Sequence, residues 1–309
     1  MKRYRILYLI ICLLASCCLF GCGAQQEAVE ESVLPEEPVE ALAPGFDVLF
    51  VSDSHIAADT TDGIFRNILT QGLAAGEDVR MVLHGGCMTV DAADEAAWAV
   101  FEQQIAVLGE TPLYPAWGDT DHAQTQNKYF TLAHNGPADL PSQFYSFDEE
   151  NAHFIMMDSS YMGLQNDSYV QWLRDDVAAA GKQWNILVMH HPLYPATEGE
   201  TDQMRAEAQR AIWLAAIEEA GIDLVLCGHQ HVYQRSEPLL QGVADADGIV
   251  YLMVSSGGAA PAGALLADGY GAVTRDDVSS YCLLHISETT IEITAFDQDG
   301  TEIDHFTLE

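Results

Sequence analysis

The chain has 309 residues, 49% of them hydrophobic, which is enough for one large domain or two small ones. Lys and Arg number 12 against 47 Asp and Glu, a formal net charge of −35. Phosphate backbones would be repelled by so acidic a chain, which argues strongly against nucleic acid as a partner. The charge argues less strongly against a small phosphorylated substrate, because bound cations can reverse the sign locally.

The first segment has the pattern of a bacterial lipoprotein signal peptide. A basic start over residues 1–5 precedes an apolar stretch over residues 6–20, which is short for a membrane span. The sequence Leu-Phe-Gly-Cys follows and resembles a lipobox, so Cys22 would carry the lipid; a second candidate box ends at Cys17. An uncleaved N-terminal anchor is the alternative. Either way we expect the protein to be extracytoplasmic, and the lipobox implies a lipid anchor in the cell membrane.

Residues 23–45 are predicted to be an acidic, disordered tether. They are rich in Glu and Pro and contain neither Lys nor Arg, and such a composition cannot bury enough apolar surface to order itself. The chain therefore divides into a signal peptide over residues 1–22, this tether, and one folded domain over residues 46–309.

Within the domain, short apolar runs typical of strands alternate with segments of helical periodicity. The predicted strands are 46–51, 79–83, 112–116, 144–147, 153–157, 184–189, 222–226, 250–254, 281–286, 290–296 and 302–308. The predicted helices are 62–75, with Asp62 as a possible cap, 92–108, 168–180 and 203–220. This order indicates an α/β fold, and the β-rich C-terminal part favours two sheets packed face to face.

Polar residues follow five of the predicted strands. His229 and His231 come after the strand over 222–226, and in extended backbone a spacing of two puts both imidazoles on one side. Converging imidazoles at a strand end form metal sites; the alternative is a surface loop that contains both. Sites in α/β folds form beyond the carboxyl ends of strands. The candidate ligands are Asp53, His55, Cys87, Asp119, His190, His229 and His231.

The order of these residues resembles that of the calcineurin-like metallophosphoesterases, with phrases similar to purple acid phosphatases. The family pattern is Asp-x-His, Gly-Asp, Gly-Asn-His-Asp/Glu, a lone His, and Gly-His-x-His. The matching segments begin at Asp53, Gly86, Gly118, His190 and Gly228. The resemblance covers residues 46–235 and implies a four-layer αββα sandwich of two mixed β-sheets flanked by helices.

The resemblance also implies two metal ions, Zn, Mn or Fe, which clamp a phosphoryl group and supply a hydroxide that attacks a phosphate ester. The implied ligands are Asp53, His55 and His231 for one metal, and Asp119, His190 and His229 for the other. Cys87 would bridge the two. Val90 stands where the purple enzymes have a tyrosine ligand, so no iron–tyrosinate centre is expected.

Cys87 departs from the family pattern, which has a bridging aspartate there. A thiolate suits zinc better than Mn or Mg. The alternatives are a small buried residue without a metal role, or a disulfide with Cys227. Only three of the seven cysteines lie beyond the signal peptide, so one bridge is possible but a disulfide framework is not.

The segment that begins at Gly118 departs as well. Asp119 replaces the Asn ligand, and Thr120 replaces the histidine that stabilises the transition state or protonates the leaving group. Such a loss lowers the rate ~10²–10⁴-fold by the usual magnitude of general acid catalysis. His122 and Asp121 are the candidate catalytic residues in its place.

We therefore expect a hydrolase of phosphate mono- or diesters that acts on a small phosphorylated substrate. The alternative is a degenerate member that binds a metal or a phosphorylated ligand without efficient turnover, which the residues at positions 87 and 120 motivate. Among other residues, His84 is predicted to be structural, and His191 to form a hydrogen bond near the site rather than to ligate. Tyr233 and Arg235 are predicted to brace the turn after the histidine pair.

Overall fold

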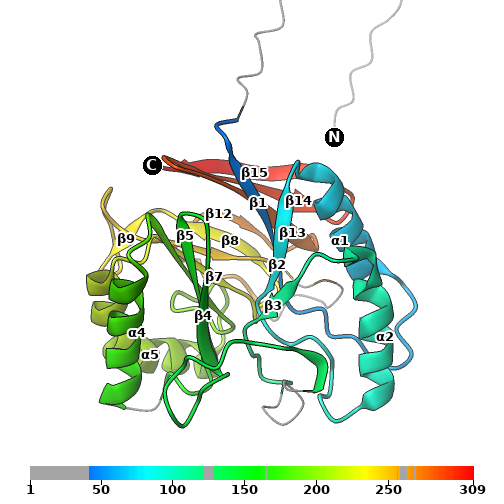
Figure 1. The fold of residues 1–309 in the computed structure, drawn as a ribbon, viewed down its shortest axis with the longest axis horizontal. Helices are drawn as coiled ribbons and strands as arrows, with labels where there is room; N and C mark the ends of the chain where they lie inside the picture. The colour runs from blue at the N-terminus through cyan, green and yellow to red at the C-terminus, as the bar shows by residue number, and fades with distance from the viewer. Residues whose placement is uncertain (1–41, 122–127, 164–165, 256, 258–262, 268) are drawn as a thin grey trace, which may run out of the picture. The chain divides into compact units, whose positions relative to one another are not determined.

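Two β-sheets pack face to face, and each carries helices on its outer side (Figure 1). The computed structural model describes residues 42–121, 128–163, 166–255, 257, 263–267 and 269–309. These residues form a single unit that begins at Leu42. The predicted signal peptide with Cys22, most of the predicted tether, and the catalytic candidate His122 lie outside the described residues. In the described part, the helices are all too short or too polar to cross a membrane.

The first sheet has six strands in the order β15-β14-β13-β1-β2-β3. Their bounds are Gly45–Val51 for β1, Val79–His84 for β2, Leu113–Pro115 for β3, Ser280–Ser287 for β13, Ile291–Asp297 for β14 and Glu302–Leu308 for β15. Helices α1 (Ile64–Ala75) and α2 (Glu95–Ile105, continued by a 3-10 turn over Ala106–Leu108) cover its outer face.

The second sheet has seven strands in the order β12-β8-β11-β7-β6-β5-β4. Their bounds are Phe144–Glu149 for β4, Ala152–Met157 for β5, Trp184–Met189 for β6, Leu224–Cys227 for β7, Tyr233–Ser236 for β8, Val250–Met253 for β11 and Gly271–Arg275 for β12. Helices α4 (Asp167–Ala180) and α5 (Glu200–Ala220) cover its outer face. Strands β9 (Leu239–Leu240) and β10 (Val243–Ala244) form a separate small ribbon.

Side-chain alternation explains why the central strands are apolar throughout. In β1, Phe46, Val48 and Phe50 belong to the core between the sheets, whereas Leu49 and Val51 belong to the core under α1 and α2. Strand β6 divides its side chains between two cores in the same way. A strand that is buried on both faces reads as a continuous apolar run, because successive residues point to opposite faces.

Parallel pairing brings the carboxyl ends of the central strands to common edges. Strands β1, β2 and β3 are parallel, with Val51 opposite His84 and His84 opposite Pro115. Strands β5, β6 and β7 are parallel in the other sheet. The two edges are joined by hydrogen bonds, for example from the backbone N–H of His229 to Asp53 Oδ2 at 2.8 Å. One region therefore receives loops from both sheets.

All eleven predicted strands and all four predicted helices are present, within a few residues of their expected bounds. Helix α2 begins at Glu95 rather than residue 92, because Asp94 caps it by accepting the N–H groups of Ala96 and Ala97. The predicted strands do not include β8, β12 or the two-residue strands β9 and β10. Strands β8 and β12 are short and mixed in polarity, and β8 pairs with both β11 and β12.

Candidate metal centre

The candidate ligands lie on tight loops that follow β1, β2, β3, β6 and β7. Seven described residues other than glycine have positive φ, and five of them are candidate ligands: Asp53 at 53°, His55 at 41°, Cys87 at 54°, His229 at 76° and His231 at 54°. A left-handed backbone at such residues costs on the order of 1–3 kcal/mol each and persists where the surroundings impose it. The strained backbone conformation of these residues is therefore maintained by the surrounding fold, and it sets the direction of their side chains.

The first group of possible ligands consists of Asp53, His55 and Cys87, whose donor atoms all lie within 4.8 Å of one another. His231 adjoins it, since its Nε2 is 3.1 Å from His55 Nε2 and 3.5 Å from Asp53 Oδ1. Burial alone would raise the pKa of Asp53, but His190, His231 and His55 outweigh it and hold that pKa well below its usual range. A carboxylate oxygen and two imidazole nitrogens converge here, and these are donor atoms that commonly bind a metal cation.

The second group consists of Asp119, His190, His191 and His229, again with donor atoms within 4.8 Å of one another. His229 Nδ1 lies 3.5 Å from Asp119 Oδ2, and His191 Nε2 lies 3.1 Å from both oxygens of Asp119. The prediction that His191 forms a hydrogen bond near the site is confirmed. It comes closer to the ligands than we expected, because it lies within the group itself.

Cys87 lies where the two groups meet. Its Sγ is 3.2 Å from His190 Nε2, and the same nitrogen lies 4.0 Å from Asp53 Oδ1. Burial, followed by the charges of Asp53 and Asp121, raises the pKa of the thiol. A bound cation would act in the opposite direction and favour the thiolate. Cys87 and Cys227 are both free and buried, so the disulfide alternative is wrong.

Neighbouring groups orient two of the histidines. The backbone carbonyl of Gly85 lies 2.8 Å from His190 Nδ1 and accepts a hydrogen bond from Nδ1–H, which leaves Nε2 with its lone pair facing Cys87. Asp202, on the first turn of α5, lies 2.9 Å from His229 Nε2, so His229 presents Nδ1 to Asp119. This bond with His229 lowers the pKa of Asp202 to about 2. Carboxylate or carbonyl partners of this kind fix the tautomer of a metal-binding histidine.

Asp121, one of the catalytic candidates, holds the backbone of the Cys87 loop. Its Oδ2 accepts the N–H groups of Cys87 at 2.7 Å and Gly118 at 2.9 Å, and its Oδ1 accepts that of Met88 at 3.2 Å. Burial raises the pKa of this carboxyl to about 6, against the effect of those hydrogen bonds. Asp121 is thereby oriented toward the backbone that presents Cys87.

Thr120 is also engaged with the backbone, since its hydroxyl donates to the carbonyl of Thr89 at 2.6 Å. His84 is structural, as predicted: it is fully buried, lies 3.1 Å from Ser54 Oγ, and has a pKa lowered by burial to about 3. Tyr233 and Arg235 are structural too, because both form hydrogen bonds with Asp304 on β15. Arg235 is therefore directed away from the candidate ligands.

Two residues that contact the candidate ligands were not identified from the sequence. Asp202 and Arg205 both lie on α5, and Arg205 Nη1 is 3.4 Å from Asp119 Oδ1. Neither belongs to a strand-end motif, and α5 lies on the outer face of its sheet. The one local signal was the position of Asp202 in the first turn of a helix. Acidic residues are common there because they interact favourably with the helix dipole, so the signal does not indicate a functional site.

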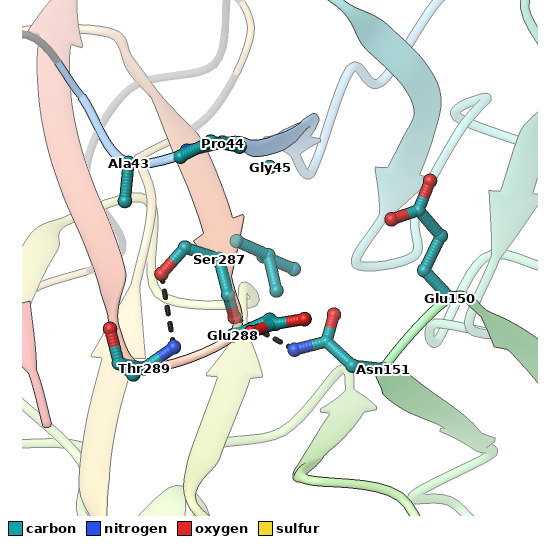
Figure 2. Close-up of a pocket in the computed structure, with 9 residues that line it drawn as sticks. Ala43, Pro44, Gly45, Glu150, Asn151, Ser287, Glu288 and Thr289 are labelled. Atoms are coloured by element: carbon teal, nitrogen blue, oxygen red, sulfur yellow. Dashed lines mark hydrogen bonds between the residues drawn. The ribbon is translucent and has the colours of Figure 1, made fainter.

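A cavity of about 410 Å³ opens beside His231. Its other lining residues include the four acidic residues Asp276, Asp277, Asp297 and Asp299. A further cavity of about 650 Å³ is lined by the start of β1 and by turns near Asn151 and Ser287, and contains none of the candidate ligands (Figure 2). There Asn151 Nδ2 donates to the carbonyl of Ser287 at 2.7 Å. Of these two cavities, the one beside His231 therefore adjoins the candidate metal centre.

Comparison with known proteins agrees with this geometry. Residues 46–233 match the calcineurin-like phosphoesterase family, and the chain therefore belongs to that family. Purple acid phosphatase 21 of Arabidopsis thaliana is 26% identical over 141 residues, which are 44% of this chain and 31% of that protein. Purple acid phosphatase 18 of the same plant is 31% identical over 123 residues, 37% of this chain and 26% of that protein. The chain thus aligns with about a third or less of the length of these relatives.

Solved structures share the fold. Purple acid phosphatase PPD1 from yellow lupin (Lupinus luteus) seeds has a TM-score of 0.73 and 17% identity, covering 86% of this chain and 54% of that one. GAP50, the anchor in the inner membrane complex of Plasmodium, has a TM-score of 0.63 and 17% identity, covering 85% and 88%. At this identity the likeness concerns architecture alone, and it confirms the predicted sandwich of two sheets flanked by helices.

Proposed function

We propose that this protein hydrolyses phosphate esters of small molecules. The observation that carries the proposal is the meeting of two groups of potential metal-binding side chains at Cys87. In the reaction, the oxygen of water forms a bond to phosphorus while the bond from phosphorus to the ester oxygen breaks. The alcohol leaves with one proton of the water, and inorganic phosphate is the other product.

The residues present fit two metal ions, because carboxylate, imidazole and thiol donors converge in two neighbouring groups. Asp53, His55 and His231 would hold one ion, and Asp119, His190 and His229 the other, with Cys87 between them. When bound, such ions supply the Lewis acidity that activates both the water and the phosphoryl group. The thiol favours zinc, whereas manganese and iron suit the oxygen and nitrogen donors.

The protein's own groups have distinct tasks in this scheme. Gly85 and Asp202 keep His190 and His229 in the tautomers that leave one nitrogen for a ligand bond. Asp121 fixes the loop that carries Cys87. The Thr120 hydroxyl donates a hydrogen bond to a backbone carbonyl, and we therefore expect the leaving alcohol to take its proton from water.

A metal-loading experiment tests the proposal. The full-length chain is purified in detergent, loaded separately with Zn, Mn and Fe, and analysed for bound metal and for turnover of p-nitrophenyl phosphate. We expect about two metal ions per chain and metal-dependent turnover. We also expect Cys87→Asp to shift the preferred metal from zinc toward manganese, because an oxygen donor replaces sulfur. Absence of bound metal in every preparation would overturn the proposal.

A second candidate function is binding of a metal or a phosphorylated ligand without efficient turnover. It is favoured by Thr120, which stands where the family has a catalytic histidine and has its hydroxyl committed to Thr89. The same experiment separates the two functions. Turnover by the native chain rules out this second function, whereas bound metal with turnover only in Cys87→Asp supports it.

We further propose that the domain is attached to the outer side of the cell membrane by a lipid on Cys22. The basic start, the apolar stretch and the lipobox-like sequence support this localisation. The acidic composition separately argues against a nucleic-acid partner. Mass spectrometry of the mature N-terminus tests it, with Cys17→Ala and Cys22→Ala as matched variants. A diacylglycerol-modified peptide that begins at Cys22 is expected, and unmodified protein in all three forms contradicts the anchor.

A further inference from the structure

We propose that Arg205 on α5 binds the phosphoryl group of the substrate and selects phosphate monoesters over diesters. The proposal rests on the proposed function and adds to it a substrate-binding residue and a substrate class. Arg205 lies one turn after Asp202, the residue that holds His229. Within the described residues, it is the one Arg or Lys that forms an ion pair with a candidate ligand, through Nη1 to Asp119 Oδ1 at 3.4 Å.

The position of Arg205 is fixed by the first turn of its helix. Asp202 bonds His229 Nε2 at 2.9 Å and Gln230 Nε2 at 2.9 Å. Gln203 donates to the carbonyl of Thr197 at 3.0 Å. These bonds attach the start of α5 to the loops around the site, so the guanidinium of Arg205 reaches the candidate ligands from a rigid element.

The contact with Asp119 does little for stability. The two side chains are 32% and 43% exposed, and ion pairs so exposed contribute about 0–1 kcal/mol. A guanidinium has five N–H donors in a fork that matches a phosphate oxygen pair. Asp119 is the one hydrogen-bond partner of Arg205 within the described part of the chain, and the Arg205 side chain is partly exposed, so it can contact a further ligand.

Other groups near Asp119 already have partners. The Thr120 hydroxyl donates to Thr89, the Asp121 carboxylate accepts backbone N–H groups, and His191 Nε2 faces Asp119. In a chain of formal net charge −35, a fixed cation beside the candidate ligands favours the binding of a phosphoryl dianion. Arg205 supplies that charge where the family histidine is replaced by Thr120. Because a monoester carries one more negative charge than a diester, it gains more from this contact.

Steady-state kinetics of the full-length, metal-loaded chain test the inference. The variants are Arg205→Gln and Arg205→Lys, with Arg174→Gln as the matched control, since Arg174 is an exposed arginine on α4 that pairs with Glu219. We expect Arg205→Gln to lower kcat/KM for p-nitrophenyl phosphate about 10²–10³-fold, the usual effect of removing one transition-state donor. The loss for bis(p-nitrophenyl) phosphate should be at least about tenfold smaller.

Two further measurements complete the test: the metal content of each variant and its inhibition by inorganic phosphate. We expect unchanged metal content in Arg205→Gln, about tenfold weaker competitive inhibition by inorganic phosphate, and partial rescue of both readouts in Arg205→Lys. Equal losses for both esters together with lost metal would show that Arg205 only positions Asp119, and would overturn the inference; so would an unchanged kcat/KM. If the native chain has no turnover, calorimetric binding of inorganic phosphate decides: weaker binding by Arg205→Gln supports the inference, and equal binding overturns it.

Discussion

Single residues at the candidate centre are constrained by close approach as much as by chemistry. Gly118 precedes the candidate ligand Asp119, and a Cβ at this position would lie 2.5 Å from the backbone nitrogen of Cys87 and 2.6 Å from its Sγ. It would also lie 2.9 Å from His190 Cε1. The loops after β2 and β3 can therefore bring their side chains together only if this residue has none.

Gly118→Ala should displace Cys87 and His190 from each other. We expect metal affinity to fall about 10–100-fold, as for changes next to a metal ligand, and the free energy of unfolding to fall by about 1–3 kcal/mol through overpacking. Metal titration with a competing chelator and thermal unfolding measure the two effects. Gly163→Ala is the matched control because a Cβ there meets no atom within 4 Å. Native metal affinity in Gly118→Ala would contradict the close approach.

At the scale of elements, a histidine network joins helix α4 to the second sheet. His153 on β5 lies 2.7 Å from Asp148 on β4 and 3.0 Å from Asp176 on α4. Lys182 lies 3.4 Å from the other oxygen of Asp148. Burial alone would lower the pKa of His153, but the hydrogen bonds with Asp176 and Asp148 outweigh it and raise that pKa.

This network makes stability depend on pH. Because the pKa of His153 is raised in the folded state, its contribution is fully present below the unfolded value of about 6.5 and is lost as the pH rises through the folded value. We expect His153→Gln to lower the free energy of unfolding by about 1–3 kcal/mol at pH 5.5, the usual worth of charged hydrogen bonds, and by less at pH 9. Urea unfolding at both values measures this. The exposed His305→Gln should show no such difference; an equal loss in His153→Gln at both pH values would contradict the charged network.

At the scale of the whole molecule, the sandwich places residues from the two halves of the chain in one site. His55 and His231 are 176 positions apart in sequence, yet their Nε2 atoms lie 3.1 Å apart. The same molecule carries a formal net charge of −35. Its field opposes the approach of anionic substrates, and salt screens that field.

Ionic strength should therefore change the approach of substrate rather than the chemical step. Between about 0.01 M and 0.15 M salt the screening length falls from about 30 Å to about 8 Å. We expect kcat/KM for p-nitrophenyl phosphate to rise several-fold over this range while kcat stays constant. Steady-state kinetics in NaCl measure it, and a fall in kcat/KM would show that local cations such as Arg205 dominate the field at the site.

The sequence by itself determined the four predicted helices, most of the strands and the identity of most candidate ligands. Apolar periodicity is a local property, so 184–189 and 302–308 were predicted at their observed bounds. Strand-end residues such as His190 were recognisable because the motifs that carry them are short. Tertiary structure alone decided that His191 lies among the ligands, that Asp202 orients His229, and that Arg205 reaches Asp119. Those contacts join segments far apart in the chain, and a contact made only on folding leaves no periodic pattern in the sequence.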